Sequence, residues 1–341
     1  MSRLLPFCLL LLCFACRHTA QRQVTPAFYY WKQAWTGNAT EMRYLKGLPA
    51  KRLYIKMFDA DLDPATGKPV PVAVFKQQAP LPDSIDLVPV VFIMNEVWQN
   101  PDTALAANIN KLLEKLCSKI PAGRIPEIQI DCDWTKSTRD AYFAFIGQLR
   151  QQSFFKGRQL SATIRMHQVK FVTSSGVPPT DKGLLMCYNM GDLRKPGDHN
   201  SILDQETMQS YISSDRVATY PLPLDIALPL FDWTVLFKAG RYAGILRNIG
   251  DAALRDTSLF ARSGRRQYTV IKDSLVNGYM LQAGNVVRRE TSDNKELEAV
   301  ARMVARQRQD YAPVVIFYHL DSVTLHNYPL DELQKIYRLF Y

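Results

Sequence analysis

Two aspartates stand two residues apart at the end of a predicted strand. Alternation along the segment 127–133 places Gln129, Asp131 and Asp133 on one face and apolar residues on the other. In a (β/α)8 barrel the outer face of each strand packs on helices, whereas the upper interior can hold polar groups. Carboxylates in that position can hold charge, orient a substrate or transfer a proton.

Other polar and aromatic residues follow the remaining predicted strands. Aromatic rings can stack on the faces of sugar rings, and carboxylates can bind sugar hydroxyls, so these residues together indicate carbohydrate recognition. Strand five adds Arg165 and His167, which share a face with Thr163. The predicted substrate-binding residues are Trp31, Lys56, Trp134, Arg165, His167, Asn189, Asp232, Trp233, His319 and Asp321.

The elements that must position these residues form an alternating series of strands and helices. This pattern in a chain of 341 residues predicts one (β/α)8 barrel of the TIM type over residues 27–341, with an insertion at 236–293 between strands seven and eight. A hairpin at Asn277-Gly278 is expected within the insertion. The eight predicted strands are 27–35, 52–58, 86–94, 127–133, 160–167, 183–189, 222–231 and 312–319.

Three local features are predicted at the ends of these elements. Ser137 and Asp140 resemble a capping box at the start of a helix over 141–150, and Asn294 is expected to cap a helix over 296–309. Alternation in strand two places Lys56 and Phe58 on one face. The acidic run 59–63 is expected to form a solvated turn, because it lacks the glycine and the distant glutamate of a calcium loop.

Two segments resemble glycoside hydrolase family 18, the family of the chitinases. The run Ile130-Asp131-Cys132-Asp133-Trp134 resembles that family's strand-four signature, Asp-x-Asp-x-Glu. The run Leu185-Met186-Cys187-Tyr188-Asn189-Met190-Gly191 resembles its strand-six segment, with Asn189 in place of the usual Asp. The chain departs from the signature at Thr135, which stands where the family has its acidic glutamate.

The resemblance implies a retaining, substrate-assisted mechanism on N-acetylated glycans. Asp133 would orient the acetamide group, Asp131 would share charge or a proton with it, and Tyr188 would bind the acetamide oxygen. Thr135 cannot protonate a leaving group, because a hydroxyl is too weak an acid. Either another group such as Glu96 supplies the proton, or the barrel binds glycans without cleaving them. A third possibility is a structural lipoprotein with a basic surface that contacts a partner.

Each candidate residue also has a structural interpretation. Asp131 and Asp133 could form an ion pair with Arg165 inside the barrel, and Glu96 could be a solvated loop carboxylate. His167 and His319 have no metal-ligand spacing, so hydrogen-bonded histidines are expected, and neither a metal nor a cofactor is predicted. Trp31 and Trp233 could equally be core aromatics.

Residues 1–16 have the features of a lipoprotein signal peptide. Arg3 precedes an apolar segment that is too short to span a bilayer, and Ala15-Cys16 resembles a lipoprotein cleavage site. Lipidation of Cys16 would anchor the protein to a membrane through a tether at 17–26. We therefore expect an exported, membrane-anchored lipoprotein of the bacterial cell envelope. An ordinary secretory peptide is the alternative, because Cys13 stands where such sites usually have Leu.

Cysteines and charge limit the remaining classes. Cys117, Cys132 and Cys187 are an odd number, which gives no disulfide framework, so Cys132 and Cys187 are expected in the core. The formal net charge is +10, and the segment 238–308 holds 14 Lys/Arg against 7 Asp/Glu. This basic surface could face anionic lipid or acidic polysaccharide, or simply be solvated. No nucleic-acid-binding module is present, so carbohydrate and a membrane are the expected partners of a monomer.

Overall fold

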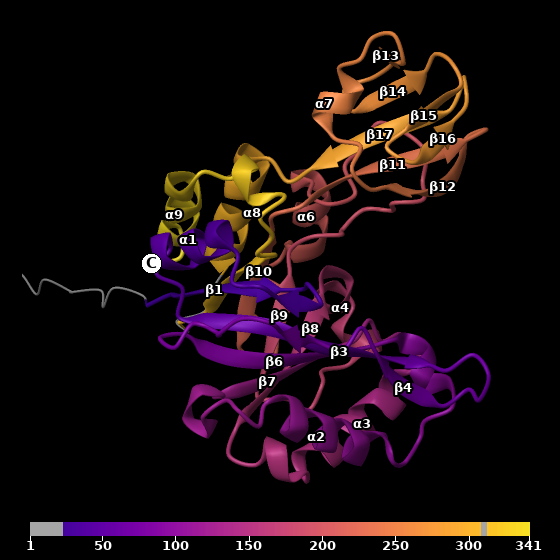
Figure 1. Cartoon of the computed structure of the whole chain (residues 1–341). Coiled ribbons are helices and arrows are strands. Elements are labelled where there is room, and N and C mark those ends of the chain that lie inside the picture. Colours follow the sequence, from indigo (N-terminus) through magenta and orange to yellow (C-terminus); the bar gives the residue numbers. More distant parts are fainter. Residues whose placement is uncertain (1–22, 308–311) are drawn as a thin grey trace, which may run out of the picture.

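Eight parallel strands close into a barrel in this computed structural model, which describes residues 23–307 and 312–341 (Figure 1). Strand β1 pairs with both β18 and β3, which completes the ring. The predicted (β/α)8 fold is therefore confirmed, and all eight predicted strands are present. Their bounds are β1 Thr25–Tyr30, β3 Arg52–Leu62, β6 Asp86–Ile93, β7 Glu127–Asp131, β8 Gln159–Arg165, β9 Lys182–Met186, β10 Leu224–Pro229 and β18 Val314–Tyr318.

Helices surround the barrel and cover the outer faces of its strands (Figure 1). In α2, Leu105, Ile109 and Leu113 recur at helical spacing and are buried against the barrel, as expected of an amphipathic helix. The helices are α1 Ala39–Gly47, α2 Leu105–Leu116, α3 Arg139–Arg150, α4 Met166–Lys170, α5 Val172–Ser175, α6 Gln205–Ile212, α8 Asn294–Gln307 and α9 Leu330–Arg338, with short turns η1 Asn95–Gln99, η2 Ala122–Arg124, η3 Ser153–Phe155 and η4 Leu325–Asn327. None of these helices is long and apolar enough to cross a bilayer.

Two helix starts differ from the sequence prediction. Helix α3 begins at Arg139, and its preceding residue Thr138 donates its hydroxyl to Asn95 instead of capping the helix, so the predicted capping box does not form. Helix α8 is capped by Asp293, whose carboxylate accepts the backbone N–H groups of Lys295 and Glu296. The prediction that Asn294 is the cap was therefore wrong by one residue. An aspartate at this position also suits the positive end of the helix dipole.

The lower half of the barrel interior is filled by an ionic network. Glu127, at the start of β7, forms ion pairs with Arg52 at 2.9 Å and with Lys182 at 2.7 Å. Lys182 also pairs with Asp225 at 2.5 Å, and Tyr54 donates its hydroxyl to Glu127. Glu127, Lys182 and Asp225 are almost wholly buried, and the positive charges of Lys182 and Arg52 together balance the two carboxylates.

A β-bulge in β3 changes which side chains face the interior. Lys56 pairs with Val90 of β6, and Phe58 pairs with the next residue, Val91, so Met57 is the extra residue. Phe58 consequently packs outward beside α2, whereas Asp59 turns inward and lies 2.8 Å from the Lys56 ammonium. The prediction that Lys56 and Phe58 share a face was therefore wrong.

Residues 59–62 form the end of β3, not a solvated turn. This extension pairs in antiparallel fashion with β4, Pro69–Val72. A second short pairing joins β2, Ala34–Trp35, to β5, Lys76–Gln77. Both additions lie at the upper end of the barrel strands, so they extend its rim.

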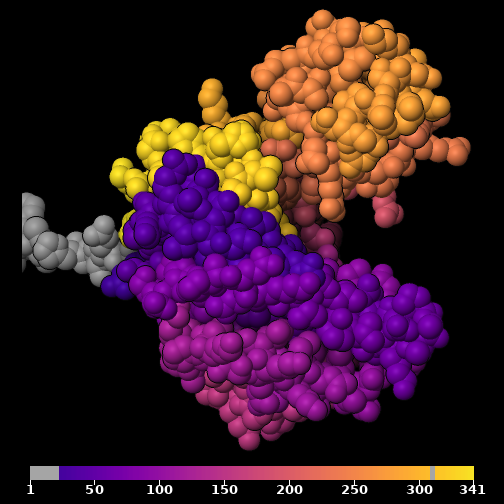
Figure 2. Space-filling model, viewed as in Figure 1, coloured from indigo at the N-terminus to yellow at the C-terminus, as the bar shows by residue number. Residues whose placement is uncertain are grey.

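The insertion between β10 and β18 folds as a separate lobe beside the barrel mouth (Figure 2). Its five-stranded sheet has the order β12-β11-β17-β14-β13 and packs around its own small apolar core. The predicted turn at Asn277-Gly278 is present, and both residues have positive φ, as the hairpin requires. The elements are β11 Asp232–Lys238, β12 Arg241–Leu246, α7 Asp251–Leu254, β13 Phe260–Arg262, β14 Gln267–Val270, β15 Ser274–Val276, β16 Tyr279–Leu281 and β17 Val286–Thr291.

Candidate functional site

The two aspartates that follow the ionic layer along β7 have different partners. Asp133 forms an ion pair with the guanidinium of Arg165, whose Nε lies 2.7 Å from Oδ1 and whose Nη2 donates a hydrogen bond of 2.8 Å to Oδ2. Asp131 instead accepts the hydroxyl of Thr163 at 2.6 Å. Arg165 thus forms the predicted structural ion pair with Asp133 only. Asp131 has no ionic partner in direct contact among the described residues.

Burial alters the protonation of Asp131. Burial of Asp131, and then the negative charge of Asp133, raise the pKa of Asp131 to about 7. The Thr163 hydrogen bond and the positive charge of Arg165 act in the opposite direction, and Asp59 adds a further increase. Asp131 can therefore hold a proton near neutral pH, which allows it to donate as well as accept a hydrogen bond.

Aromatic rings surround the pair at the mouth of the barrel. Tyr188 stacks on Tyr318 with 5.1 Å between ring centroids, and Trp31 lies 5.5 Å from the same ring. Phe231 continues this surface towards Trp233, at 5.2 Å. Burial, followed by the neighbouring Tyr318 and Asp131, raises the pKa of Tyr188 well above its usual value, so its hydroxyl is a neutral donor.

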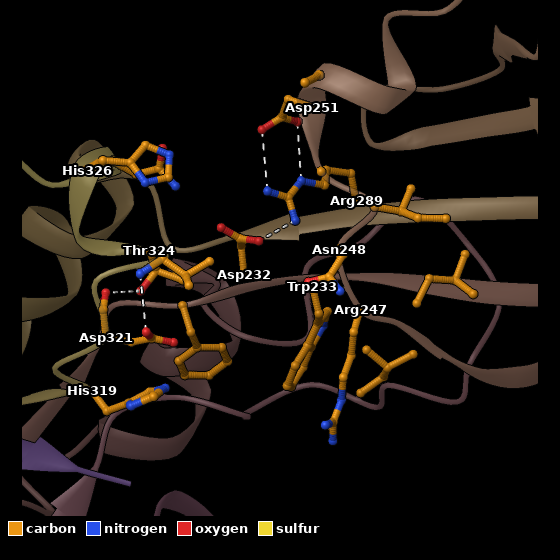
Figure 3. Close-up of a pocket in the computed structure, with 18 of the residues that line it drawn as sticks. Asp232, Trp233, Arg247, Asn248, Asp251, Arg289, His319, Asp321, Thr324 and His326 are labelled. Atoms are coloured by element: carbon orange, nitrogen blue, oxygen red, sulfur yellow. Dashed lines mark hydrogen bonds and ion pairs between the residues drawn. The ribbon is translucent and has the colours of Figure 1, made fainter. Parts of the chain in front are cut away.

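A cleft of about 890 Å³ lies between this aromatic surface and the insertion (Figure 3). The barrel side contributes Asn189, Tyr318 and His319, and the insertion side contributes Trp233 and Arg289 among others. A second pocket of about 320 Å³ adjoins it, because Asn189 lines both. Arg165, His167 and Tyr211 line that second pocket. Two hollows that share a lining residue could each hold one part of an elongated ligand.

The remaining predicted residues on the barrel side are His167, His319, Asp321 and Lys56. His167 belongs to α4 and not to β8, and burial lowers its pKa. Burial likewise lowers the pKa of His319 to about 4, so this imidazole is neutral at physiological pH. Asp321 lies 3.7 Å from Lys32, and the Lys56 ammonium lies 5.4 Å above the Trp31 ring.

Three predicted residues have positions that alter their interpretation. Trp134 is 1% exposed, stacks on Tyr142 and donates its indole N–H to the carbonyl of Ser175, so it is a core residue without a surface for sugar. Glu96 is exposed in η1 and accepts no hydrogen bond from the described residues. Thr135 is also exposed, and its hydroxyl contacts other hydroxyls at the start of α3.

Two predicted residues, Asp232 and Trp233, belong to the first strand of the insertion. The carboxylate of Asp232 accepts from Arg289 at 2.5 Å, and the Trp233 indole donates to Glu290 at 2.9 Å. Both side chains line the cleft, where Figure 3 shows Asp232 between Arg289 and the barrel side. The strand that leaves the barrel therefore carries cleft residues directly into the insertion.

Sequence reasoning missed Asp59, Tyr318 and Tyr29. The β-bulge brings Asp59 to the level of Asp131, because both pair with Phe92 of β6. Tyr318 is the last residue of β18, next to the predicted His319, and Tyr29 donates its hydroxyl to Gln129. The alternation in strand eight could have indicated Tyr318, whereas the bulge left no clear signal in the sequence.

The described residues contain no group of three or more His, Cys, Asp or Glu side chains placed to hold a metal ion. His167 lies in a pocket with Arg165, and His319 lies near Lys32 and Asp321. The three cysteines among the described residues, Cys117, Cys132 and Cys187, are buried and form no disulfide, and burial raises the pKa of each thiol. These thiols are therefore core groups and not nucleophiles.

Solved structures with this fold include enzymes that act on glycans. The spore cortex-lytic enzyme SleL from Bacillus megaterium superposes with a TM-score of 0.52 at 10% identity, covering 94% of this chain and 74% of that one. A class V chitinase from Pseudomonas fluorescens gives 0.50 at 13% identity, covering 93% and 99%. Catalytic domain 2 of the Ostrinia furnacalis group II chitinase gives 0.50 at 12%, covering 93% and 96%.

At these identities the likeness shows the fold alone, a barrel that this chain shares with the cortex-lytic enzyme and the two chitinases. No protein-family model and no curated sequence matches the chain.

Proposed function

We propose that this protein binds N-acetylated glycans across the mouth of its barrel. The observation that carries the proposal is the aromatic surface beside the Asp131–Asp133 pair, whose members Phe231, Trp233 and Tyr318 line the cleft. Aromatic faces suit the apolar faces of sugar rings, and buried polar groups at their edge suit hydroxyl and acetamide groups. The resemblance of the strand-four and strand-six segments to family 18 makes N-acetylated sugars the expected class.

We favour binding without hydrolysis. The position of the family's acid is occupied by Thr135, whose hydroxyl cannot protonate a leaving group. Asp133 is engaged by Nε and Nη2 of Arg165, so its carboxylate already has a partner where an acetamide would need it. The threonine at position 135 and the Asp133–Arg165 ion pair both disfavour hydrolysis, and neither alters the aromatic surface.

The proposal is tested by calorimetric titration with chito-oligosaccharides. Trp31→Ala removes a ring from the aromatic surface, and Tyr188→Phe removes only a hydroxyl. We expect the first variant to weaken binding about tenfold or more and the second by a few-fold, since one buried hydrogen bond contributes about 0.5–1.5 kcal/mol. Tyr220→Phe is the matched control, because Tyr220 is buried outside the cleft. Wild-type protein that binds none of these sugars would refute the proposal.

Hydrolysis is a second candidate, favoured by the raised pKa of Asp131. A carboxyl group with a pKa of about 7 is matched to general acid catalysis near neutral pH. If Asp131 or Glu96 supplies the acid, the wild type should cleave aryl N-acetylglucosaminides, and Asp131→Asn or Glu96→Gln should abolish this activity. If the barrel is inactive, Thr135→Glu should create activity, because a positioned acid is typically worth ~10²–10⁴-fold in rate.

We also propose that the protein is exported and anchored to the cell envelope through a lipid on Cys16. The sequence Ala15-Cys16 after an apolar segment supports this, and these residues lie outside the part that the structure describes. Cys16→Ser should release the protein from membranes, whereas Cys117→Ser should leave it membrane-bound because that thiol is buried in the core. A mature wild-type protein with no acyl group at Cys16 would exclude the anchor.

A further inference from the structure

Two arginines on the insertion wall of the cleft have no acidic partner. Arg247 follows β12 and Arg255 follows α7, and both are exposed and line the cleft. Neither guanidinium forms an ion pair or hydrogen bond with another residue of the described ranges 23–307 and 312–341. Their charges therefore face the cleft without compensation.

The acidic residues of the same cleft already have cationic partners. Arg289 donates to Asp232 and to Asp251, and it is largely buried between them. Asp321 lies 3.7 Å from Lys32. Three arginines and three aspartates line the cleft, so its formal charges balance. Pairing decides what remains available, because it engages all three carboxylates and leaves two guanidinium groups for a ligand.

The position of Arg247 connects its charge with the aromatic surface. Figure 3 shows its side chain extending alongside Trp233, with the guanidinium directed away from the Arg289 ion pairs. Trp233 packs on Phe231, the ring that continues to Tyr318 at the barrel mouth. A sugar ring that stacks on Trp233 would therefore present its substituents to Arg247.

We propose that the insertion wall selects glycans that carry carboxylate groups, and that Arg247 and Arg255 recognise them. A guanidinium group presents two parallel N–H donors, which match the two oxygens of a carboxylate. The inference rests on the proposed glycan binding and adds the substrate class: an N-acetylated chain with an acidic substituent on some of its sugars. A neutral chain would leave both guanidinium groups solvated and would gain nothing from them.

The test compares three tetrasaccharides with the same N-acetylated β-1,4-linked backbone. The first is neutral chitotetraose, the second alternates N-acetylglucosamine with N-acetylmuramic acid, and the third is the methyl ester of the second. The second and third differ only in the esterification of the lactyl groups, which replaces each negative carboxylate with a neutral methyl ester. At low ionic strength we expect the acid to bind about tenfold more tightly than its ester, because each exposed contact contributes up to about 1 kcal/mol. This advantage should shrink in about 1 M salt, where the Debye length falls to ~3 Å.

Arginine variants assign the effect to the insertion wall. Arg247→Gln and Arg255→Gln should each weaken binding of the acid about threefold and leave binding of the ester unchanged. Arg241→Gln is the matched control, because Arg241 is exposed on the same lobe but does not line the cleft. The effect of Trp31→Ala should be similar for all three sugars, since it acts through the aromatic surface.

The outcomes separate this inference from the function on which it rests. Equal affinity for the acid and its ester, with unchanged binding by both cleft variants, would overturn the charge selection and leave glycan binding intact. Failure of all three sugars to bind would overturn both. A preference for the acid that survives both arginine substitutions would also contradict the assignment to Arg247 and Arg255.

Discussion

The lower and upper halves of the barrel interior both contain buried carboxylates, but the partners of these carboxylates differ. In the lower half, Glu127 and Asp225 are both paired with Lys182, and Glu127 also has Arg52. In the upper half, Asp131 has one hydroxyl partner and a pKa of about 7. The lower carboxylates are closed off by the barrel, whereas Asp131 stands next to Asp133, whose side chain is 43% exposed.

This difference separates groups that hold the fold from groups that are available for a ligand. A carboxylate with a complete set of buried partners contributes to a unique packing and offers nothing to solvent. Burial raises the pKa of Asp225 as well as that of Asp131, so the distinguishing feature of Asp131 is the lack of a cation in direct contact with it. A buried carboxyl group of this kind is characteristic of functional sites. Four substitutions test the comparison, and they are described from the largest expected effect to the smallest.

Lys182→Met should cause the largest loss of stability. It leaves Asp225 without a cation and removes one of the two cations from Glu127, both in the barrel interior. Breaking a buried ion pair typically costs about 3–5 kcal/mol, which urea denaturation would measure. Lys119→Met is the control, because that side chain is exposed on the surface. A loss below about 1 kcal/mol would show that the lower layer is not structural.

Asp131→Asn should remove the loss of stability that ionisation of Asp131 causes as pH rises. The pKa of Asp131 is about 7 in the folded protein and ~4 in the unfolded chain, so the folded state binds the extra proton between these values. The contribution of Asp131 to stability is thus present below pH ~4 and is lost as pH rises through 7. The variant should gain on the wild type by about a few kcal/mol between pH 4 and 8, measured by urea midpoints. A constant difference would contradict the raised pKa.

Asp133→Asn should change stability much less, although it breaks the ion pair with Arg165. The Asp133 side chain is 43% exposed, so solvent screens the pair. Exposed ion pairs contribute about 0–1 kcal/mol, and thermal unfolding should show a correspondingly small shift. A loss as large as that of Lys182→Met would place Asp133 among the structural charges.

Asp59→Asn should produce the smallest effect, a downward shift in the titration of Asp131. Asp59 is the weakest of the contributors that raise the Asp131 pKa, and its removal also frees the positive charge of Lys56. NMR titration of the Asp131 carboxyl carbon would detect the direction. An unchanged or upward midpoint would show that the β-bulge does not couple the two carboxylates.

Sequence patterns predicted the barrel because its signals are local and repeated. Each apolar strand ends near polar residues and is followed by a helix, so the eight strands could be placed within a few residues. The alternation at 129–133 correctly placed Asp131 inside, where it contacts Thr163 of the next strand. These features depend only on the period of the chain.

The features that were mispredicted depend on tertiary contacts or on a change of period. The β-bulge at Met57 shifts the alternation by one residue, which exchanged the faces of Phe58 and Asp59. Trp134 was predicted to bind substrate, but the loop after β7 places it on Tyr142 in the core. The arginines with which the insertion lines the cleft were not predicted, because their positions depend on how the lobe folds and packs beside the barrel.

The way in which the insertion is attached makes it an exchangeable module. Its first and last strands pair in antiparallel fashion, with Asp232 opposite Thr291, so the chain leaves and re-enters the barrel at neighbouring points. A short turn could therefore replace the whole lobe without rerouting the barrel. The lobe is also locked in orientation, because the fully buried Arg288 donates to the carbonyls of Leu193, Lys195 and Gly197. A different lobe would need an equivalent contact with the loop 193–197 to keep the cleft at its present width. Recombination could therefore change specificity only if the lobe and this loop were exchanged together.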